Sequence, residues 1–203
     1  MVMKPITIVS SRFLSSDELD LRIKRKPFSL SQGDITVTNN ADGGVNFDIK
    51  QNFFSLLGRK VMFDAAGIPV LSLHKKLWSL DSVWDVFKGD SNERIFCAKQ
   101  SSFFAFITSL NVFLKCNTKE NVCDFKVIES GWFDELSTIY ARDGTTAVAK
   151  MRKKHTFQSF VLGKDRYDVT VYPNVDYAFI MALVVILHEY NEENSNDGKK
   201  SAE

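Results

Sequence analysis

The chain has 203 residues, of which 44% are hydrophobic, so it is long enough for one substantial domain with a buried core or for two small ones. Its 26 Lys and Arg residues are balanced by 25 Asp and Glu residues, which excludes a global basic field that would draw it onto nucleic acid. The three cysteines, an odd number, and the lack of any Asn-x-Ser/Thr sequon favour a reducing compartment. Residues 1–18 contain no long apolar core and no small-residue cleavage site, so we expect no signal peptide. These features predict a cytoplasmic or nuclear protein that is not secreted.

From residue 19 onward, most of the chain is expected to form short strands joined by turns. The segments LDLRIKRK, GVNFDIK and CDFKV alternate apolar and polar residues, which is typical of antiparallel strands with one buried and one wet face. Turn signals such as NNADGG, KGDSNE and ARDG lie between the runs, so we expect roughly ten to twelve strands. The predicted inward-facing residues in the three segments are Leu19, Leu21, Ile23, Val45, Phe47, Ile49, Cys123, Phe125 and Val127.

The segment DYAFIMALVVILHEY, residues 176–190, is predicted to be a helix that is apolar on every side from Tyr177 to Leu187. It is shorter than the about 20 apolar residues that a membrane crossing needs, and it lacks the polar face of a surface helix. Either Asn174 or Asp176 is expected to cap its first turn. A helix of this length spans roughly 22 Å and is about 10–12 Å wide, which matches the interior of a closed barrel of many strands. The sequence therefore predicts a mainly β fold, a closed antiparallel barrel around a central buried hydrophobic C-terminal helix, with no transmembrane span.

A resemblance to a known family agrees with this prediction. Residues 152–191, RKKHTFQSFVLGKDRYDVTVYPNVDYAFIMALVVILHEYN, closely resemble the C-terminal signature of the plant LURP-one-related proteins, and GRKVMFDAAGIPVLSLHKK and VWDVFKGDS match the same pattern. The resemblance implies a 12-stranded barrel like the Tubby C-terminal domain and the phospholipid scramblases. It covers about residues 19–191, so we expect a weakly ordered segment at 1–18, a barrel domain at 19–191 and a disordered polar tail at 192–203.

The resemblance implies that the protein functions as a non-enzymatic binding module. The family is loosely associated with plant defence, related Tubby domains bind phosphoinositides, and some are proposed to be membrane-tethered transcription regulators. By fold analogy, we expect recognition of phosphoinositide or other anionic phospholipid head groups, with a peripheral location at the plasma membrane or in the nucleus. Two alternatives stay open, namely a protein-interaction or transcription adaptor without a lipid ligand, and a scramblase-like activity. No cofactor is expected.

A local basic cluster in AVAKMRKKH, residues 147–155, is the strongest candidate for a head-group site. Strand alternation places Lys150, Arg152 and Lys154 on one face, opposite Ala147, Ala149 and Met151. Arg binds phosphate through its planar fork and Lys acts as a point charge, so such a face suits an anionic head group. The alternative interpretation is the solvated outer face of a barrel strand. The predicted site residues are Lys150, Arg152 and Lys154 on the strand and Lys164 and Arg166 in the following turn, and weaker candidates are Arg22–Lys26, Arg59–Lys60 and Lys75–Lys76.

Other chemistry-bearing residues carry weaker signals. Cys116 and Cys123 flank a turn, but two cysteines alone make no zinc site, and we expect the cysteines to be reduced and structurally passive. The acidic run at 189–197 lacks the spacing of a calcium loop and is expected to be a solvated helix end. The sequence contains no Gly-rich phosphate loop, nucleophile elbow or paired-carboxylate signature, so we expect no enzyme. The histidines, which are expected to be structural, are His74, His155 and His188.

Overall fold

The computed structural model describes residues 4–25, 34–51, 59–76, 82–104, 107–130, 136–154 and 166–200. These residues form twelve strands, a short 3-10 helix η1 (Ser11–Phe13) and one α-helix, α2 (Tyr177–Lys200). The strands are β1 (Leu19–Arg25), β2 (Ile35–Asn39), β3 (Val45–Gln51), β4 (Lys60–Asp64), β5 (Pro69–Lys75), β6 (Val83–Lys88), β7 (Arg94–Phe104), β8 (Ile107–Leu114), β9 (Phe125–Ser130), β10 (Leu136–Ala141), β11 (Ala147–Lys154) and β12 (Arg166–Val171).

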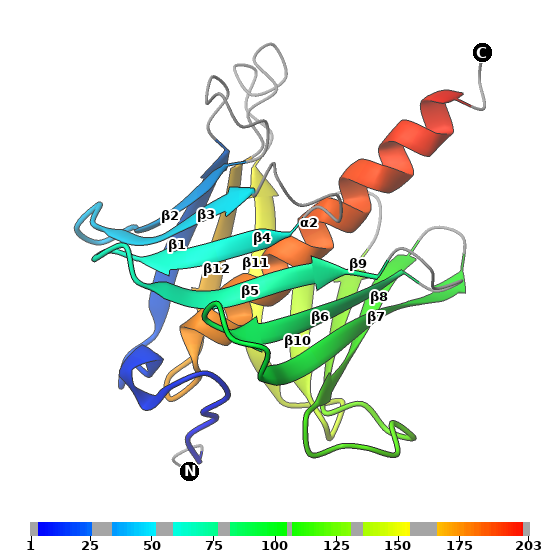
Figure 1. The fold of residues 1–203 in the computed structure, drawn as a ribbon, viewed down its shortest axis with the longest axis horizontal. Helices are drawn as coiled ribbons and strands as arrows, with labels where there is room; N and C mark the ends of the chain where they lie inside the picture. Colours follow the sequence, from blue (N-terminus) through cyan, green and yellow to red (C-terminus); the bar gives the residue numbers. More distant parts are fainter. Residues whose placement is uncertain are drawn as a thin grey trace.

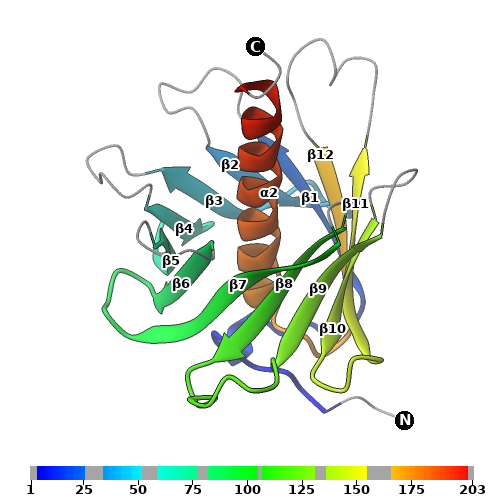
Figure 2. The ribbon, with the colours of Figure 1, turned by 90° about the vertical axis from the view of Figure 1, so that its right-hand side faces the viewer.

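Each strand pairs antiparallel with its neighbours in sequence, and β1 pairs antiparallel with β12 to close the barrel. Figures 1 and 2 show the strands surrounding α2, which enters the barrel at one end and leaves it at the other. The predicted fold, a closed antiparallel 12-stranded barrel around a central helix, is therefore confirmed. Within the described part of the chain, no helix combines the length and the apolar content that a membrane crossing requires.

The predicted alternation is correct in the strand interiors and wrong near some strand ends. Phe47 and Ile49 are buried as expected, but Val45 is 44% exposed because the register shifts between Val37 and Thr38 on the paired strand. In β11 a bulge opposite Ile139 turns Val148 inward, where Ala147 was predicted. Bulges place two residues opposite one and so reverse the facing of the residues beyond them. Cys123, also predicted to face inward, precedes β9 and is only partly buried.

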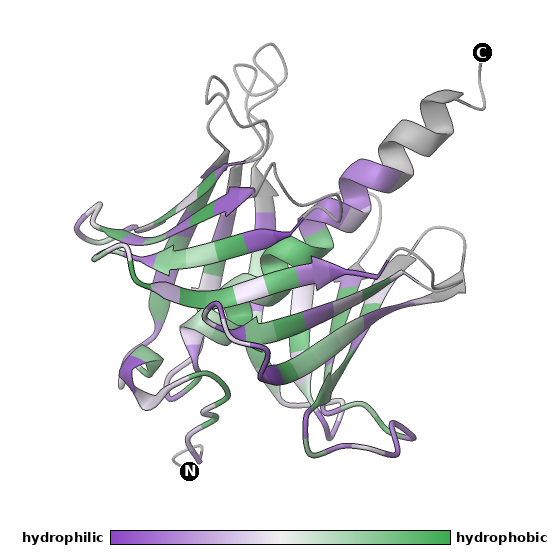
Figure 3. Cartoon of the chain, in the orientation of Figure 1, coloured by the Kyte–Doolittle hydropathy of each residue, from purple (hydrophilic) through white to green (hydrophobic). Residues whose placement is uncertain are grey.

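The helix fills the barrel, as its composition predicts. Every residue from Ala178 to Leu187 is buried, and the Phe179 ring lies 5.2 Å from the Phe96 ring and 4.8 Å from the Phe125 ring. Figure 3 shows the change along α2 from hydrophobic residues inside the barrel to hydrophilic residues where it leaves. The helix continues to Lys200, beyond its predicted end near Tyr190, so part of the expected polar tail has helical backbone.

Residues 4–18, expected to be weakly ordered, cover the barrel end where α2 begins. Ile6 forms a parallel bridge with Val175, and the N–H groups of Ile8, Val9 and Ser10 donate to one carboxylate oxygen of Asp176 at 3.1, 2.7 and 3.1 Å. The other oxygen accepts from the first turn of α2. Asp176 is thus the cap, whereas Asn174, the alternative, adopts a left-handed φ of 62°. The N-terminal segment is held by a residue far from it in sequence.

Candidate functional site

Two basic segments that are distant in sequence lie side by side on the outside of the barrel. The strand β12 pairs with β11 on one side and with β1 on the other. In this register Asp168 lies between Arg152 and Arg22, and Thr170 lies between Lys150 and Asp20. We call the outward-facing residues Arg22, Lys24, Lys150 and Arg152 the basic patch.

The predicted site residues are placed as follows. Lys150 and Arg152 are exposed while their neighbours Ala149 and Met151 are buried, so the predicted facing of this part of β11 is correct. Lys154 and Arg166 are register partners on β11 and β12, and Lys24 on β1 is opposite Arg166. Lys164 and His155 lie outside the described residues.

The basic patch is interrupted by acidic residues. A carboxylate oxygen of Asp168 lies 3.1 Å from the Arg22 Nε, and the Thr170 hydroxyl donates to Asp20 at 2.7 Å. The Lys150 ammonium lies 6.0 Å from the centre of the Tyr172 ring, within the range of a cation–π contact. The face is therefore a mixed surface in which cations outnumber carboxylates, and its rigid strands fix their spacing.

Three of the weaker basic candidates, Lys60, Lys75 and Lys76, have acidic partners, and Lys26 lies outside the described residues. Lys60, only 2% exposed, lies 3.1 Å from Glu189 where α2 leaves the barrel, and Lys75 pairs with Glu193 one helical turn later. Lys76 lies 3.0 Å from Asp85. Glu189 and Glu193 are partly exposed, as expected for a helix end, but both also pair with lysines of the surrounding strands, which was not predicted.

A group of possible metal ligands lies in the same region. The ligand atoms of His188, Glu189 and Glu192 are within 4.8 Å of one another. The Tyr167 hydroxyl is 3.1 Å from the His188 Nδ1, and Lys60 is paired with Glu189. A neighbouring ammonium opposes a bound cation, so we interpret this group as part of the network that fixes the helix in the barrel.

The buried cysteine is unsuited to nucleophilic chemistry. Burial raises the pKa of the Cys97 thiol, and the negative charge of Glu120 raises it further. The thiol lies 3.6 Å from a Glu120 oxygen, so it is held in its protonated form at neutral pH. Because the thiolate is the reactive species, Cys97 is a poor nucleophile. Of the other two thiols, Cys116 is exposed and Cys123 is partly buried.

Comparisons with known proteins agree with this architecture. The model of the LURP-one-related family matches residues 19–188. Protein LURP-one-related 15 from Arabidopsis thaliana is 40% identical over 190 residues, covering 92% of this chain and 87% of that protein. Protein LURP1 from the same plant is 40% identical over 189 residues, covering 92% of this chain and 90% of that protein.

A solved structure gives the same result at the level of the fold. An X-ray structure of an Arabidopsis thaliana protein superposes with a TM-score of 0.71 at 32% identity, covering 91% of this chain and 98% of that chain. The sequence match extends from β1 into α2, so it includes all twelve described strands and the helix as far as His188. The chain belongs to the LURP-one-related family.

Proposed function

We propose that the protein is a non-enzymatic binding module that recognises phosphoinositide or other anionic phospholipid head groups at a membrane surface through the basic patch. The observation that carries the proposal is the strand register, which brings Arg22 and Lys24 of β1 beside Lys150 and Arg152 of β11, with β12 between them. Cations on rigid strands need little reorganisation to meet a phosphate, and Arg adds a planar fork of donors.

The charge pattern supports weak binding. Each basic residue near an anionic surface contributes roughly 1 kcal/mol, while Asp20 and Asp168 reduce the local positive potential. Exposed charges are screened beyond roughly 8 Å at physiological salt, so binding should weaken as salt is added. A module of this kind would associate reversibly with the membrane.

The burial of α2 favours a peripheral module over a scramblase-like activity. Insertion of the helix into lipid would require its apolar residues to leave the barrel, and each buried Leu, Ile, Val, Phe or Met contributes roughly 1.5–3 kcal/mol to the folded state. A resting role inside the barrel is therefore strongly preferred for the segment from Ala178 to Leu187.

Sedimentation with vesicles tests the proposal. Vesicles of phosphatidylcholine with added phosphatidylserine or a phosphoinositide should bind the wild type at low salt and release it at high salt. Replacing Lys150, Arg152 and Lys154 together with Ala should remove most of the vesicle binding. The melting temperature should stay nearly unchanged, because Lys150 and Arg152 are exposed and substitutions at exposed positions change stability little.

The matched control removes the same number of charges elsewhere. Lys88, Lys115 and Lys119 are exposed and lie at turns, so their triple Ala variant should keep near-normal vesicle binding. An equal loss of vesicle binding in both triple variants would show that binding responds only to the net charge of the protein. No binding by the wild type at low salt would overturn the lipid proposal and leave the adaptor interpretation, and equal binding by the first variant would move the site to the Arg22–Lys24 side.

A further inference from the structure

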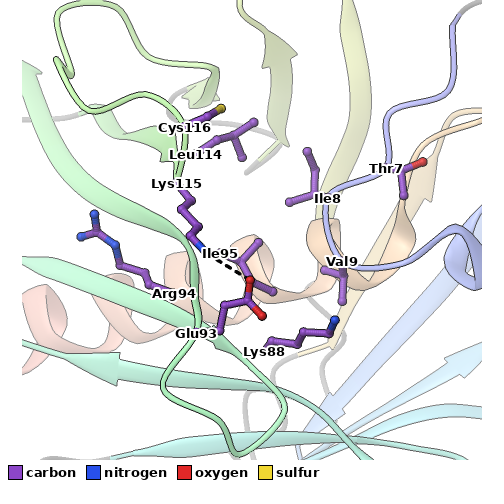
Figure 4. Close-up of a pocket in the computed structure, with 10 residues that line it drawn as sticks. All are labelled: Thr7, Ile8, Val9, Lys88, Glu93, Arg94, Ile95, Leu114, Lys115 and Cys116. Atoms are coloured by element: carbon purple, nitrogen blue, oxygen red, sulfur yellow. Dashed lines mark hydrogen bonds and ion pairs between the residues drawn. The ribbon is translucent and has the colours of Figure 1, made fainter.

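A pocket of about 550 Å³ lies on the side of the barrel away from the basic patch, between the N-terminal segment and the turns at the ends of β6, β7 and β8. This volume falls within the range of roughly 300–1,000 Å³ that is common for small-molecule sites. Its lining residues, shown in Figure 4, are Thr7, Ile8, Val9, Lys88, Glu93, Arg94, Ile95, Leu114, Lys115 and Cys116.

One part of the lining is apolar. Ile8 and Val9 come from the N-terminal segment, and Ile95 and Leu114 come from β7 and β8. All four are partly buried and contact the hydrophobic core of the barrel. An apolar group that packs against these four residues would gain roughly 25 cal/mol of binding free energy per Å² of apolar surface removed from water.

The charged part of the lining has an excess of positive charge, with Lys88, Arg94 and Lys115 against Glu93. The Lys115 ammonium lies 3.1 Å from a Glu93 oxygen. The hydrogen bond and charge of Lys115, and then the charge of Lys88, lower the pKa of the Glu93 carboxyl. The Arg94 guanidinium lies 3.2 Å from Asp85 and points away from Ile8 and Val9 in Figure 4. Lys88 extends toward Val9 in the same view. Asp85 also pairs with Lys76 at 3.0 Å, so it offsets Arg94 only in part. Lys88 is the lining cation that extends toward the apolar wall.

The walls are fixed by backbone hydrogen bonds on both sides. The N–H groups of Ile8 and Val9 are held by Asp176, and the Gly89 N–H donates to the Val70 carbonyl at 2.8 Å. Gly89 has a φ of 54°, and a Cβ at this position would lie 3.2 Å from the Pro69 carbonyl oxygen. Only glycine combines a positive φ with this close approach to the Pro69 carbonyl without strain. The turn that follows Lys88 therefore depends on Gly89. The pocket is preformed, which lowers the entropic cost of binding.

We propose that this pocket binds a small amphiphilic monocarboxylate, with its carboxylate on Lys88 and its apolar body against Ile8, Val9, Ile95 and Leu114. The excess of positive charge in the lining suits an anionic group, and Lys88 is the cation that extends toward the apolar wall. The apolar wall matches a body that water solvates poorly. The site does not depend on the proposed membrane binding, because it shares no residue with the basic patch and lies on another side of the barrel.

Octanoate is a suitable probe because it carries one carboxylate and a flexible apolar chain. In the full chain labelled at Ile, Leu and Val methyl groups, octanoate below its micelle concentration should cause saturable chemical-shift changes at Ile8, Val9, Ile95 and Leu114. 1-Octanol should bind at least about tenfold more weakly, because a charge-assisted hydrogen bond is lost. Equal affinity for 1-octanol, or octanoate shifts spread over other methyl groups, would overturn the proposal.

Substitutions at Lys88 separate the charge from the shape of the side chain. Lys88→Met keeps much of the length and should weaken octanoate about tenfold, whereas Lys88→Arg keeps the charge and should stay within about threefold of the wild type. Lys150→Met removes an exposed lysine of the basic patch and should leave octanoate affinity unchanged. An unchanged affinity in Lys88→Met, measured on protein with a wild-type melting curve, would contradict the assignment of the carboxylate to Lys88.

A further experiment tests whether the pocket binds a free carboxylate or instead binds phosphate or a lipid head group. Inorganic phosphate alone should cause no saturable shift at the four apolar residues, and Lys88→Met should bind anionic vesicles as the wild type does. Tight phosphate binding at these residues, or loss of vesicle binding in Lys88→Met, would instead identify the pocket as a head-group site and overturn the monocarboxylate proposal.

Discussion

The two ends of α2 are held in the barrel by different chemistry. At its start, one buried carboxylate, Asp176, accepts five backbone N–H groups from the N-terminal segment and the first helical turn. At its exit, side chains of α2 pair with strand side chains, as in Lys60 with Glu189 and Lys75 with Glu193. Tyr190 adds a hydrogen bond from its hydroxyl to the Ser82 carbonyl.

The difference follows from what each end must do. The starting end is sealed, so its polar groups need partners inside the protein, and backbone donors supply them without bringing in a second charge. The exit end passes from the core to water, so lysines and glutamates can pair there while keeping part of their hydration. We therefore expect the starting end to respond mainly to loss of hydrogen bonds and the exit end to respond to salt and pH.

The apolar segment between the two ends should give the largest effect. Ile180→Asp places an unpaired charge in the core and should destabilise the protein by about 5 kcal/mol or more, enough to prevent folding. Soluble yield and circular dichroism melting measure this. Ile180→Leu, the size-matched control, should cost less than about 1.5 kcal/mol. A soluble Ile180→Asp protein with a near-normal melting temperature would refute the buried-axis arrangement.

At the starting end, Asp176→Ala removes the acceptor of five N–H groups at once. We expect the free energy of unfolding, measured with urea, to fall by about 2–4 kcal/mol. Buried N–H donors without an acceptor and the loss of the helix cap both destabilise the folded state. Asp176→Asn should lose less because it keeps one carbonyl oxygen. Hydrogen exchange at Ile8, Val9 and Ser10 should also accelerate more than exchange in the strands, and a uniform change across the protein would argue against a local tether.

At the exit end, Lys60→Met should lower the free energy of unfolding by only about 1 kcal/mol. The substitution keeps the apolar stem of the side chain, and the Glu189 carboxylate that loses its partner is partly exposed to water. Adding Glu189→Leu should recover most of that loss, which a double-mutant cycle measures. Stability of the wild type should fall slightly with added salt, and the double variant should not share this dependence. If Lys60→Met lowered the free energy of unfolding as much as Asp176→Ala does, the two ends of α2 would not differ in how strongly they hold the helix.

The smallest effect is expected from pH at the exit end. Burial lowers the pKa of His74, and the positive charge of Arg59 lowers it further. A lowered folded-state pKa means that stability is present above the unfolded value of about 6.5 and is lost as pH falls through the folded value. Between about pH 7.5 and 5.5 the wild type should therefore lose more stability than His74→Gln. Parallel pH profiles in urea unfolding would exclude His74 as a contributor.

The strands and the helix could be predicted from sequence because their signals are local. Alternation in β1 and β3 and the unbroken apolar run in α2 each indicate burial without knowledge of distant contacts. The ion pairs at the exit of α2 were not predicted for the same reason, since the polarity of Glu189 and Glu193 indicates only solvent exposure until the lysines of β4 and β5 are placed beside them. A buried lysine such as Lys60 cannot be recognised without its partner.

The candidate site was predictable only in part. The outward facing of Lys150 and Arg152 follows from alternation in β11, but the nearness of Arg22 depends on the pairing of β1 with β12, which joins the two ends of the sheet. The pocket beside Lys88 could not be found at all, because the anchoring of Ile8 and Val9 by Asp176 connects residues more than 160 positions apart. Contacts of that range leave no periodic signal in a sequence.

The position of the core helix after all twelve strands has a consequence for biosynthesis. The apolar faces of the strands leave the ribosome first, and the segment that fills them is made last. The closing pair, β1 with β12, likewise waits for nearly the whole chain. Domains with such late, long-range contacts fold slowly and expose aggregation-prone surface meanwhile. We therefore expect the nascent chain to emerge as a series of hairpins without a core until α2 has been made.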